Sequence, residues 1–155
     1  PYISIGAILA AFLTMLIKRL INQQRPPGAL SLDPGMPSSH ALVSTFMSTA
    51  WAVHCWSALV TVPLLAAAAT ISVLRVACGY HTWAQIGVGA LLGGAMAVGW
   101  MTLGRAVLAV GSAGGSGTTT TVAIYSTYLL GSAFFLAKQF RSKKVLRSSQ
   151  TKPPL

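Results

Sequence analysis

Residues 84–103 read AQIGVGALLGGAMAVGWMTL, a run of 20 residues without a charged side chain. A helix of about 20 apolar residues spans the hydrocarbon core of a bilayer, so this run predicts a transmembrane helix. The run is rich in glycine, and Gly89 and Gly93 have the spacing that lets two helices approach closely in lipid. We therefore expect one face of this helix to pack tightly on a neighbouring helix.

The rest of the chain shares this apolar character. Hydrophobic residues make up 54% of the 155 residues and charged residues 8%, whereas soluble domains carry about 25% charged residues. Further apolar stretches cover residues 2–17, 39–55, 58–74 and 122–137. The sequence thus predicts an all-α bundle of about five membrane helices over residues 1–137, followed by a basic, polar and disordered tail over residues 138–155.

The net charge of +10 is concentrated near the end of the chain. Six of the 11 Lys and Arg residues lie between Lys138 and Lys152, directly after an apolar run, where anionic lipid headgroups are nearer partners than nucleic acid. Cys55 and Cys78 lie in apolar segments without metal-ligand spacing, so we expect small buried side chains rather than a disulfide or a zinc site. Because the chain begins at Pro1 and is apolar at once, we expect a processed or truncated product, from which either a targeting peptide or a first helix is missing.

The first polar segment follows the first apolar stretch. We expect KRLINQQ, residues 18–24, to continue that helix until Arg25 and Pro26, where the fixed φ of proline ends it. Lys18 and Arg25 would then lie about two turns apart on one helix face, where two cations can hold one phosphate. The alternative is that the basic residues are anchors that snorkel to the membrane edge, and the spacing alone does not decide.

The second polar segment is Pro37-Ser38-Ser39-His40, at the point where a loop enters an apolar helix. Ser38 or Ser39 is a natural N-cap, and the unpaired N–H groups of a helix N-terminus attract anions. His40 in the first turn would be close enough to protonate the leaving oxygen of a phosphate docked there. Taken alone, the segment favours a helix cap followed by an incidental histidine.

The third polar segment contains Arg75, His81 and Gln85, between two apolar stretches. Counting membrane crossings returns it to the face that holds the first two segments. Gln85 at i+4 can place its amide oxygen on an N–H of the His81 imidazole and fix the tautomer of that ring. His54 lies beside tryptophans at the opposite interface, and we interpret it as structural.

These residues resemble the signature of the type 2 phosphatidic acid phosphatase superfamily, which is K-x6-R-P, then P-S-G-H, then S-R-x5-H-x3-D. Three positions depart from it: Ser39 stands where Gly is common, Leu74 where Ser is common, and Gln85 where Asp is common. The strings KRLINQQRP, LDPGMPSSHA and HTWAQ resemble the branch that holds plastid lipid phosphate phosphatases and dolichyl diphosphatases. In that branch PSSH and the terminal Gln are familiar variants. The positions that match the signature are Lys18, Arg25, Pro26, Pro37, Ser38, His40, Arg75 and His81.

The resemblance implies the helical bundle of that superfamily and a role for each site residue. His81 would attack phosphorus to form a phosphohistidine, and His40 would protonate the leaving group. The phosphoryl oxygens would be held by Lys18, Arg25, Arg75, Ser38, Ser39 and the amides of the helix terminus.

The chemistry of the acidic residues bears on the same mechanism. Gln85 gives a neutral acceptor where Asp would give a charge, so slower turnover is expected. No cofactor and no metal are implied, because a two-metal site cannot be assembled from a single acidic residue, Asp33. Asp33 itself, in the string DPG, is interpreted as a turn residue.

The resemblance also implies the class of substrate. A phosphatidate-like lipid phosphate is the first expectation and a dolichyl or polyprenyl diphosphate is the alternative. A non-catalytic protein that binds anionic lipid remains a third possibility. A plastid inner envelope membrane is favoured as the location over the endoplasmic reticulum membrane. The basic tail favours a site toward the stroma or cytosol by the positive-inside rule, whereas the resemblance favours the opposite face, and the sequence does not decide between them. The sequence does not predict an oligomeric state.

Overall fold

The computed structural model describes residues 2–29, 33–113, 118–119, 121–127 and 129–133. Four long helices run through it: α1 (Tyr2–Ile21), α2 (Ser39–Cys55), α3 (Ala58–Ala77) and α4 (Trp83–Ala113). The described residues between 118 and 133 are helical as well, and the described part of the chain contains no strand. The predicted all-α membrane bundle is confirmed.

Among the described residues, three helices are long and apolar enough to cross a membrane: α1, α3 and the part of α4 from Trp83 to Val110. α2 has 17 residues and lies at the short end of the range for transmembrane helices. The fifth predicted stretch, residues 122–137, lies partly outside the described residues. The predicted tail at 138–155 lies wholly outside them.

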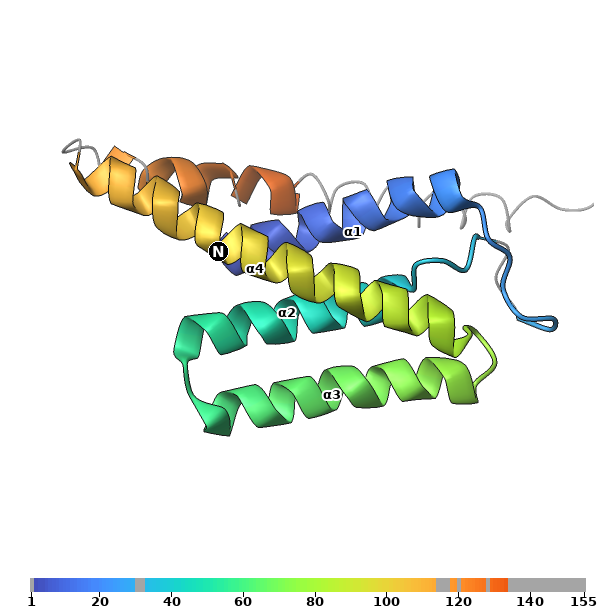
Figure 1. Ribbon diagram of the computed structural model, residues 1–155. Helices are drawn as coiled ribbons and strands as arrows, with labels where there is room; N and C mark the ends of the chain where they lie inside the picture. Colours follow the sequence, from blue (N-terminus) through green and yellow to red (C-terminus); the bar gives the residue numbers. More distant parts are fainter. Residues whose placement is uncertain (1, 30–32, 114–117, 120, 128, 134–155) are drawn as a thin grey trace, which may run out of the picture.

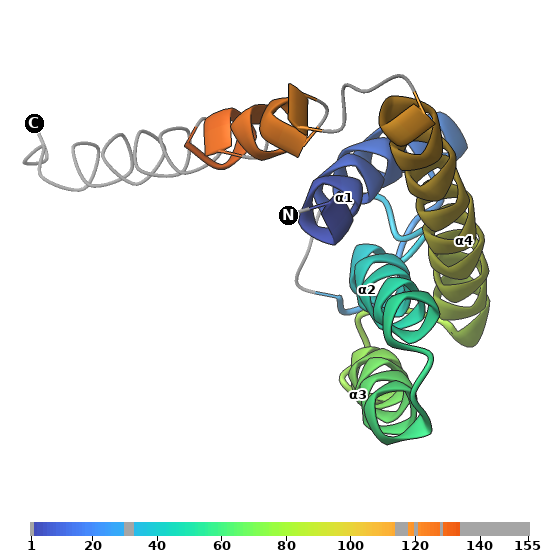
Figure 2. The same ribbon diagram turned by 90° about the vertical axis from the view of Figure 1, so that its left-hand side faces the viewer.

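α2 lies at the centre of the bundle and packs against α1, α3 and α4 (Figures 1 and 2). Its inner face carries apolar side chains every three to four residues, so one stripe is buried along its length. The Ser48 hydroxyl on another face donates to the Leu64 carbonyl of α3 at 2.8 Å. The buried core consists of Leu42, Phe46 and Ala50 of α2 with Ala10 of α1 and Ala97 and Met101 of α4.

Gly89 and Gly93 of α4 face α2, so the tight packing on a neighbouring helix that the sequence predicted is present. A Cβ added to Gly89 would lie 2.7 Å from the Ser38 carbonyl oxygen and 3.3 Å from the Ala41 Cβ. A Cβ added to Gly93 would overlap the backbone at Leu42. Only glycine permits this approach, so α4 is held directly against the start of α2.

The prediction that α1 continues to Arg25 is wrong, because the helix ends at Ile21. Asn22 adopts a positive φ of 47°, a conformation that Asn tolerates better than most residues. Its N–H closes the helix on the Lys18 carbonyl at 2.9 Å. A loop therefore joins Lys18 to Arg25, and helical register does not set their relative position.

Two further expectations need correction. α4 extends to Ala113 rather than ending near Leu103, since the residues that follow are also good helix formers. Its length of about 45 Å exceeds the roughly 30 Å hydrocarbon core. Cys55 and Cys78 are unpaired, but they are exposed rather than buried because they stand where α2 and α3 end.

Candidate active site

The three polar segments that the sequence singled out lie at one end of the bundle. α1 and α3 end there, and α2 and α4 begin there (Figure 1). Gln85 at the start of α4 is hydrogen-bonded to Gln24 after α1 and to Ser38 before α2. The count of membrane crossings made from the sequence therefore placed the segments on the correct side.

His81 lies in the turn between α3 and α4, and only 3% of it is exposed. Its Nε2 lies 3.2 Å from Nη1 of Arg25, which can only donate, so Nε2 is the acceptor. Nδ1 therefore carries the proton and donates it to Oε1 of Gln85 at 3.1 Å, the contact expected from the i+4 spacing. This tautomer leaves a lone pair on Nε2, which is the form that a nucleophile requires.

The Gln85 side chain uses both ends of its amide and is 1% exposed. Oε1 also accepts the N–H of Thr82 at 3.2 Å, while Nε2 donates to the Gln24 carbonyl at 3.0 Å and to Oε1 of Gln23 at 3.2 Å. These partners fix the orientation of the amide and so the acceptor that His81 meets. A carboxylate at this position would have no N–H group for Gln23 and Gln24, which gives the departure from Asp a structural reason.

The backbone around Gln85 binds the same segments. Its carbonyl accepts the N–H of Ser38 at 3.0 Å, and the N–H of Gly35 donates to the Gln23 carbonyl at 2.7 Å. A Cβ on Gly35 would lie 2.5 Å from Nε2 of Gln85. Glycine is therefore needed at position 35 for the loop to close over the amide.

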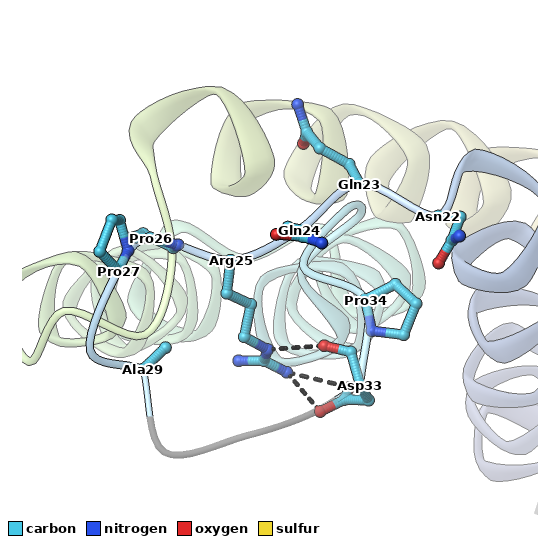
Figure 3. A pocket seen from close by; sticks show the side chains of 9 residues that line it. All are labelled: Asn22, Gln23, Gln24, Arg25, Pro26, Pro27, Ala29, Asp33 and Pro34. Carbon is cyan, nitrogen blue, oxygen red and sulfur yellow. Dashed lines mark hydrogen bonds and ion pairs between the residues drawn. The ribbon is translucent and has the colours of Figure 1, made fainter.

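Arg25 reaches from the loop after α1 to the turn that holds His81. Its Nη1 donates to the Tyr80 carbonyl and to Nε2 of His81, both at 3.2 Å. Its Nη2 donates to Oδ1 and Oδ2 of Asp33 at 2.8 and 2.9 Å, and its Nε donates to the Asp33 carbonyl at 3.0 Å. Figure 3 shows this side chain extended across the loop toward Asp33.

Asp33 also binds Lys18, whose Nζ lies 2.9 Å from Oδ2 and 2.6 Å from the Pro34 carbonyl. The interpretation of Asp33 as a turn residue therefore missed its main contacts. Lys18 and Arg25 are brought together, as predicted, but through this carboxylate. The signal was present in the sequence, because a lone acidic residue in a chain of net charge +10 has many cations to pair with.

The two serines of the second segment differ. Ser38 is the N-cap of α2 and is fully buried, and its hydroxyl accepts the N–H of Ala41 at 3.5 Å. Its own N–H is bound by Gln85, so Ser38 holds the helix terminus in place. Ser39 is partly exposed and lines an apolar groove together with His40.

That groove has a volume of about 400 Å³ and runs between α2 and α3, lined further along by Val43, Met47 and Ile71. His40 lines this groove and is exposed. The charges of Arg75, Lys18 and Arg25 act on its imidazole. A hydrocarbon chain in the groove would place its polar end beside His40.

Arg75 stacks on the Tyr80 ring, with Cζ 4.3 Å from the ring centroid. Its Nε is buried, and among the described residues no hydrogen-bond acceptor contacts it. Its carbonyl accepts the N–H groups of Tyr80 and His81, so the same residue shapes the turn that carries the nucleophile candidate. A buried donor without an acceptor suits a site that receives an anion.

The electrostatic environment keeps His81 neutral. Burial lowers the pKa of His81 below its ordinary value, the hydrogen bond to Gln85 opposes this, and the charges of Arg25, Lys18 and Arg75 lower the pKa further. The imidazole is therefore unprotonated at neutral pH, as nucleophilic attack requires.

Comparison with known proteins finds lipid phosphatases among the relatives of the chain. Lipid phosphate phosphatase epsilon 1, chloroplastic, of Arabidopsis thaliana is 36% identical over 112 residues, which cover 67% of this chain and 40% of the relative. Dolichyldiphosphatase 1 of Callithrix jacchus is 34% identical over 123 residues, covering 66% of this chain and 52% of the relative, and that of Homo sapiens is 32% identical with the same coverage. The chain spans about half the length of these relatives or less. It matches no family profile and no solved structure.

These relatives belong to the type 2 phosphatidic acid phosphatase superfamily, whose signature the chain resembles. Within it, the relatives are the epsilon-type lipid phosphate phosphatases and the dolichyldiphosphatases. This is the branch that the sequence motifs predicted.

Proposed function

We propose that the chain is a membrane phosphatase that removes phosphate from a lipid through a phosphohistidine on Nε2 of His81, without a metal or other cofactor. The observation that carries the proposal is the fixed tautomer of His81, with Nδ1–H bound to Gln85 and the lone pair of Nε2 directed at the cationic group Arg25. An isolated structural histidine needs neither arrangement.

The proposed reaction has two steps. Nε2 of His81 attacks phosphorus while the bond to the leaving oxygen breaks, and His40 gives that oxygen a proton. Water, deprotonated by His40, then attacks the phosphohistidine and releases inorganic phosphate and the free imidazole. Lys18, Arg25 and Arg75 stabilise the charge on the phosphoryl oxygens in both steps.

The proposed substrate is a phosphatidate-like monoester, hydrolysed to diacylglycerol and phosphate. The groove of about 400 Å³ beside His40 supports a leaving group that carries a hydrocarbon chain. The dolichyldiphosphatase relatives support a polyprenyl diphosphate as the alternative. Residues 1–137 would form the catalytic membrane domain, in a plastid envelope or, for the alternative substrate, in the endoplasmic reticulum.

The test is phosphate release by the purified protein in detergent micelles from phosphatidate and, separately, from a polyprenyl diphosphate. We expect turnover of at least one substrate, loss of turnover in His81→Ala, and an acid-labile, base-stable phosphoenzyme in the wild type. Full activity in His81→Gln or His40→Ala would contradict the mechanism. Anionic-lipid binding without turnover would support the non-catalytic alternative instead.

A further inference from the structure

Asp33 occupies the place where a phosphoryl group is expected. All three guanidinium nitrogens of Arg25 are engaged: Nε by the Asp33 carbonyl, Nη2 by the Asp33 carboxylate, and Nη1 by the Tyr80 carbonyl and Nε2 of His81. Both carboxylate oxygens of Asp33 lie within hydrogen-bond distance of Nη2, and Oδ2 also binds Nζ of Lys18. Phosphate oxygens accept charge-assisted hydrogen bonds from arginine and lysine in the same way.

A substrate cannot bind Arg25 while these contacts remain. The Lys18 and Arg25 side chains are 7% and 8% exposed, whereas that of Asp33 is 52% exposed. The cations are therefore fixed in the protein, and their acceptor is the group open to solvent. An incoming anion from the solvent side meets the carboxylate first.

We propose that Asp33 is an internal counter-ion that fills the phosphoryl subsite of the free enzyme and that the phosphoryl group of the substrate displaces it. The proposal rests on the proposed function. While the site is empty, the carboxylate pairs with two buried cations and offsets one of their two charges, which would otherwise be costly to keep without a partner. When phosphate has been released from His81, the return of Asp33 to Lys18 and Arg25 favours departure of the product.

The proposal and a simple positioning role predict opposite changes in phosphate affinity when Asp33 is neutralised. If Asp33 only held Lys18 and Arg25 in place, neutralising it would weaken phosphate binding. If Asp33 competes for the same donors, neutralising it raises the population of free cations and strengthens binding. The direction of the change in phosphate affinity therefore separates the two roles.

The first experiment measures binding of inorganic phosphate to the full chain in detergent by calorimetry. We expect Asp33→Asn to bind roughly tenfold more tightly than the wild type. Asp33→Glu, which keeps the charge, should stay close to the wild type, and Lys18→Ala should bind weakly in either background. Equal or weaker binding by a folded Asp33→Asn protein would overturn the proposal.

A second measurement uses the wild type and does not depend on that variant folding. Asp33 is the single Asp or Glu among the 155 residues, so labelling aspartate with ¹³C at the carboxyl carbon gives one side-chain carboxylate signal. We expect this signal to shift as phosphate is added, with the midpoint at the concentration that inhibits turnover.

An unchanged signal at phosphate concentrations that inhibit would overturn the displacement while leaving the proposed function standing. If the wild type neither binds phosphate nor turns over any lipid phosphate, the proposed function fails and this inference fails with it.

Discussion

The two ends of the bundle contain similar residues but differ in how those residues are held. At the end away from the site, His54 meets Trp51 edge to face at 5.6 Å, Arg105 donates to the Val53 carbonyl at 3.0 Å, and a cavity of about 310 Å³ lies between them. The site end has histidines and arginines too, and a polar cavity of about 390 Å³ beside Arg25 (Figure 3).

The two ends differ in how many segments of the chain supply partners to their polar side chains. His54 and Arg105 are exposed and make one described contact each to neighbouring helices or to their own helix. His81 and Gln85 are buried, and their partners come from three separate segments. A histidine, an arginine and a cavity therefore do not identify a site, whereas a buried polar network drawn from several helices does.

The largest expected effect comes from exchanging the histidines of the two ends for alanine. His81→Ala removes the proposed nucleophile and should lower kcat by at least about a thousandfold. His54→Ala, the matched control, should leave kcat within about twofold. An equal loss of kcat in the two variants would show that the two ends of the bundle do not differ in function. Initial rates of phosphate release in micelles measure both.

Gln85→Glu keeps the shape of the side chain and adds a negative charge beside Nδ1 of His81. The carboxylate should raise the pKa of His81, since it favours the protonated ring, and move the acidic limb of kcat/KM up by about one pH unit. It also faces the Gln24 carbonyl with an acceptor, which should cost about 1–3 kcal/mol of stability. The pH profile and thermal unfolding test the two consequences separately.

In the wild type, the pKa of His81 is lowered from the ordinary value of 6.5, so the proposed nucleophile stays unprotonated to below pH 6.5. The acidic limb of the pH profile of kcat/KM should therefore lie below that pH. A wild-type limb well above pH 7 would contradict the environment described for His81. An unmoved limb in Gln85→Glu would show that the side chain does not act on the imidazole.

Gly89→Ala tests whether helix packing supports the site. Its Cβ would lie 2.7 Å from the Ser38 carbonyl, so the start of α2 must shift, at a cost of about 1–3 kcal/mol. We expect a lower Tm and a fall in kcat/KM of roughly tenfold. Gly87→Ala on the same helix, where an added Cβ meets nothing within 4 Å, should change neither.

The smallest effect is expected at Tyr80, whose ring lies under Arg75. Tyr80→Leu removes a contact worth about 0.5–1 kcal/mol and should raise KM about twofold to fivefold without lowering kcat. Tyr80→Phe keeps the ring face and should retain the KM of the wild type. A raised KM in Tyr80→Phe would show that the hydroxyl, and not the face of the ring, supports Arg75.

Much of the fold could be predicted because apolar runs of membrane length determine helices almost directly. The count of crossings then placed His40, Arg75 and His81 at one end, and the spacing of Gly89 and Gly93 indicated the tight contact with α2. Local backbone choices were harder. Asn22 ends α1 by adopting a positive φ. This is the backbone choice of a single residue, so no periodic pattern in the sequence predicts it.

The contacts made by single side chains were also beyond the sequence. The lone acidic residue indicated an ion pair, but not that Asp33 pairs with Lys18 and Arg25, because the choice of cation depends on where the loop passes. The i+4 spacing predicted the contact of the Gln85 amide oxygen with His81. It did not predict the contacts of the amide nitrogen, whose partners are 61 and 62 residues away in the sequence. Long-range partners of this kind follow from tertiary packing rather than from local spacing.

The position of Gln85 as the shared partner of the loop after α1 and of the cap of α2 has a consequence for biogenesis. Gln24 and Ser38 are synthesised well before residue 85, and during that interval their backbone groups lack the partners that they have in the finished bundle. Insertion of α4 supplies those partners, so the site is completed only when the last of the four long helices docks. A nascent chain that ends before α4 would contain His40, Lys18 and Arg25 but not Gln85, so the polar network of the site could not form in it.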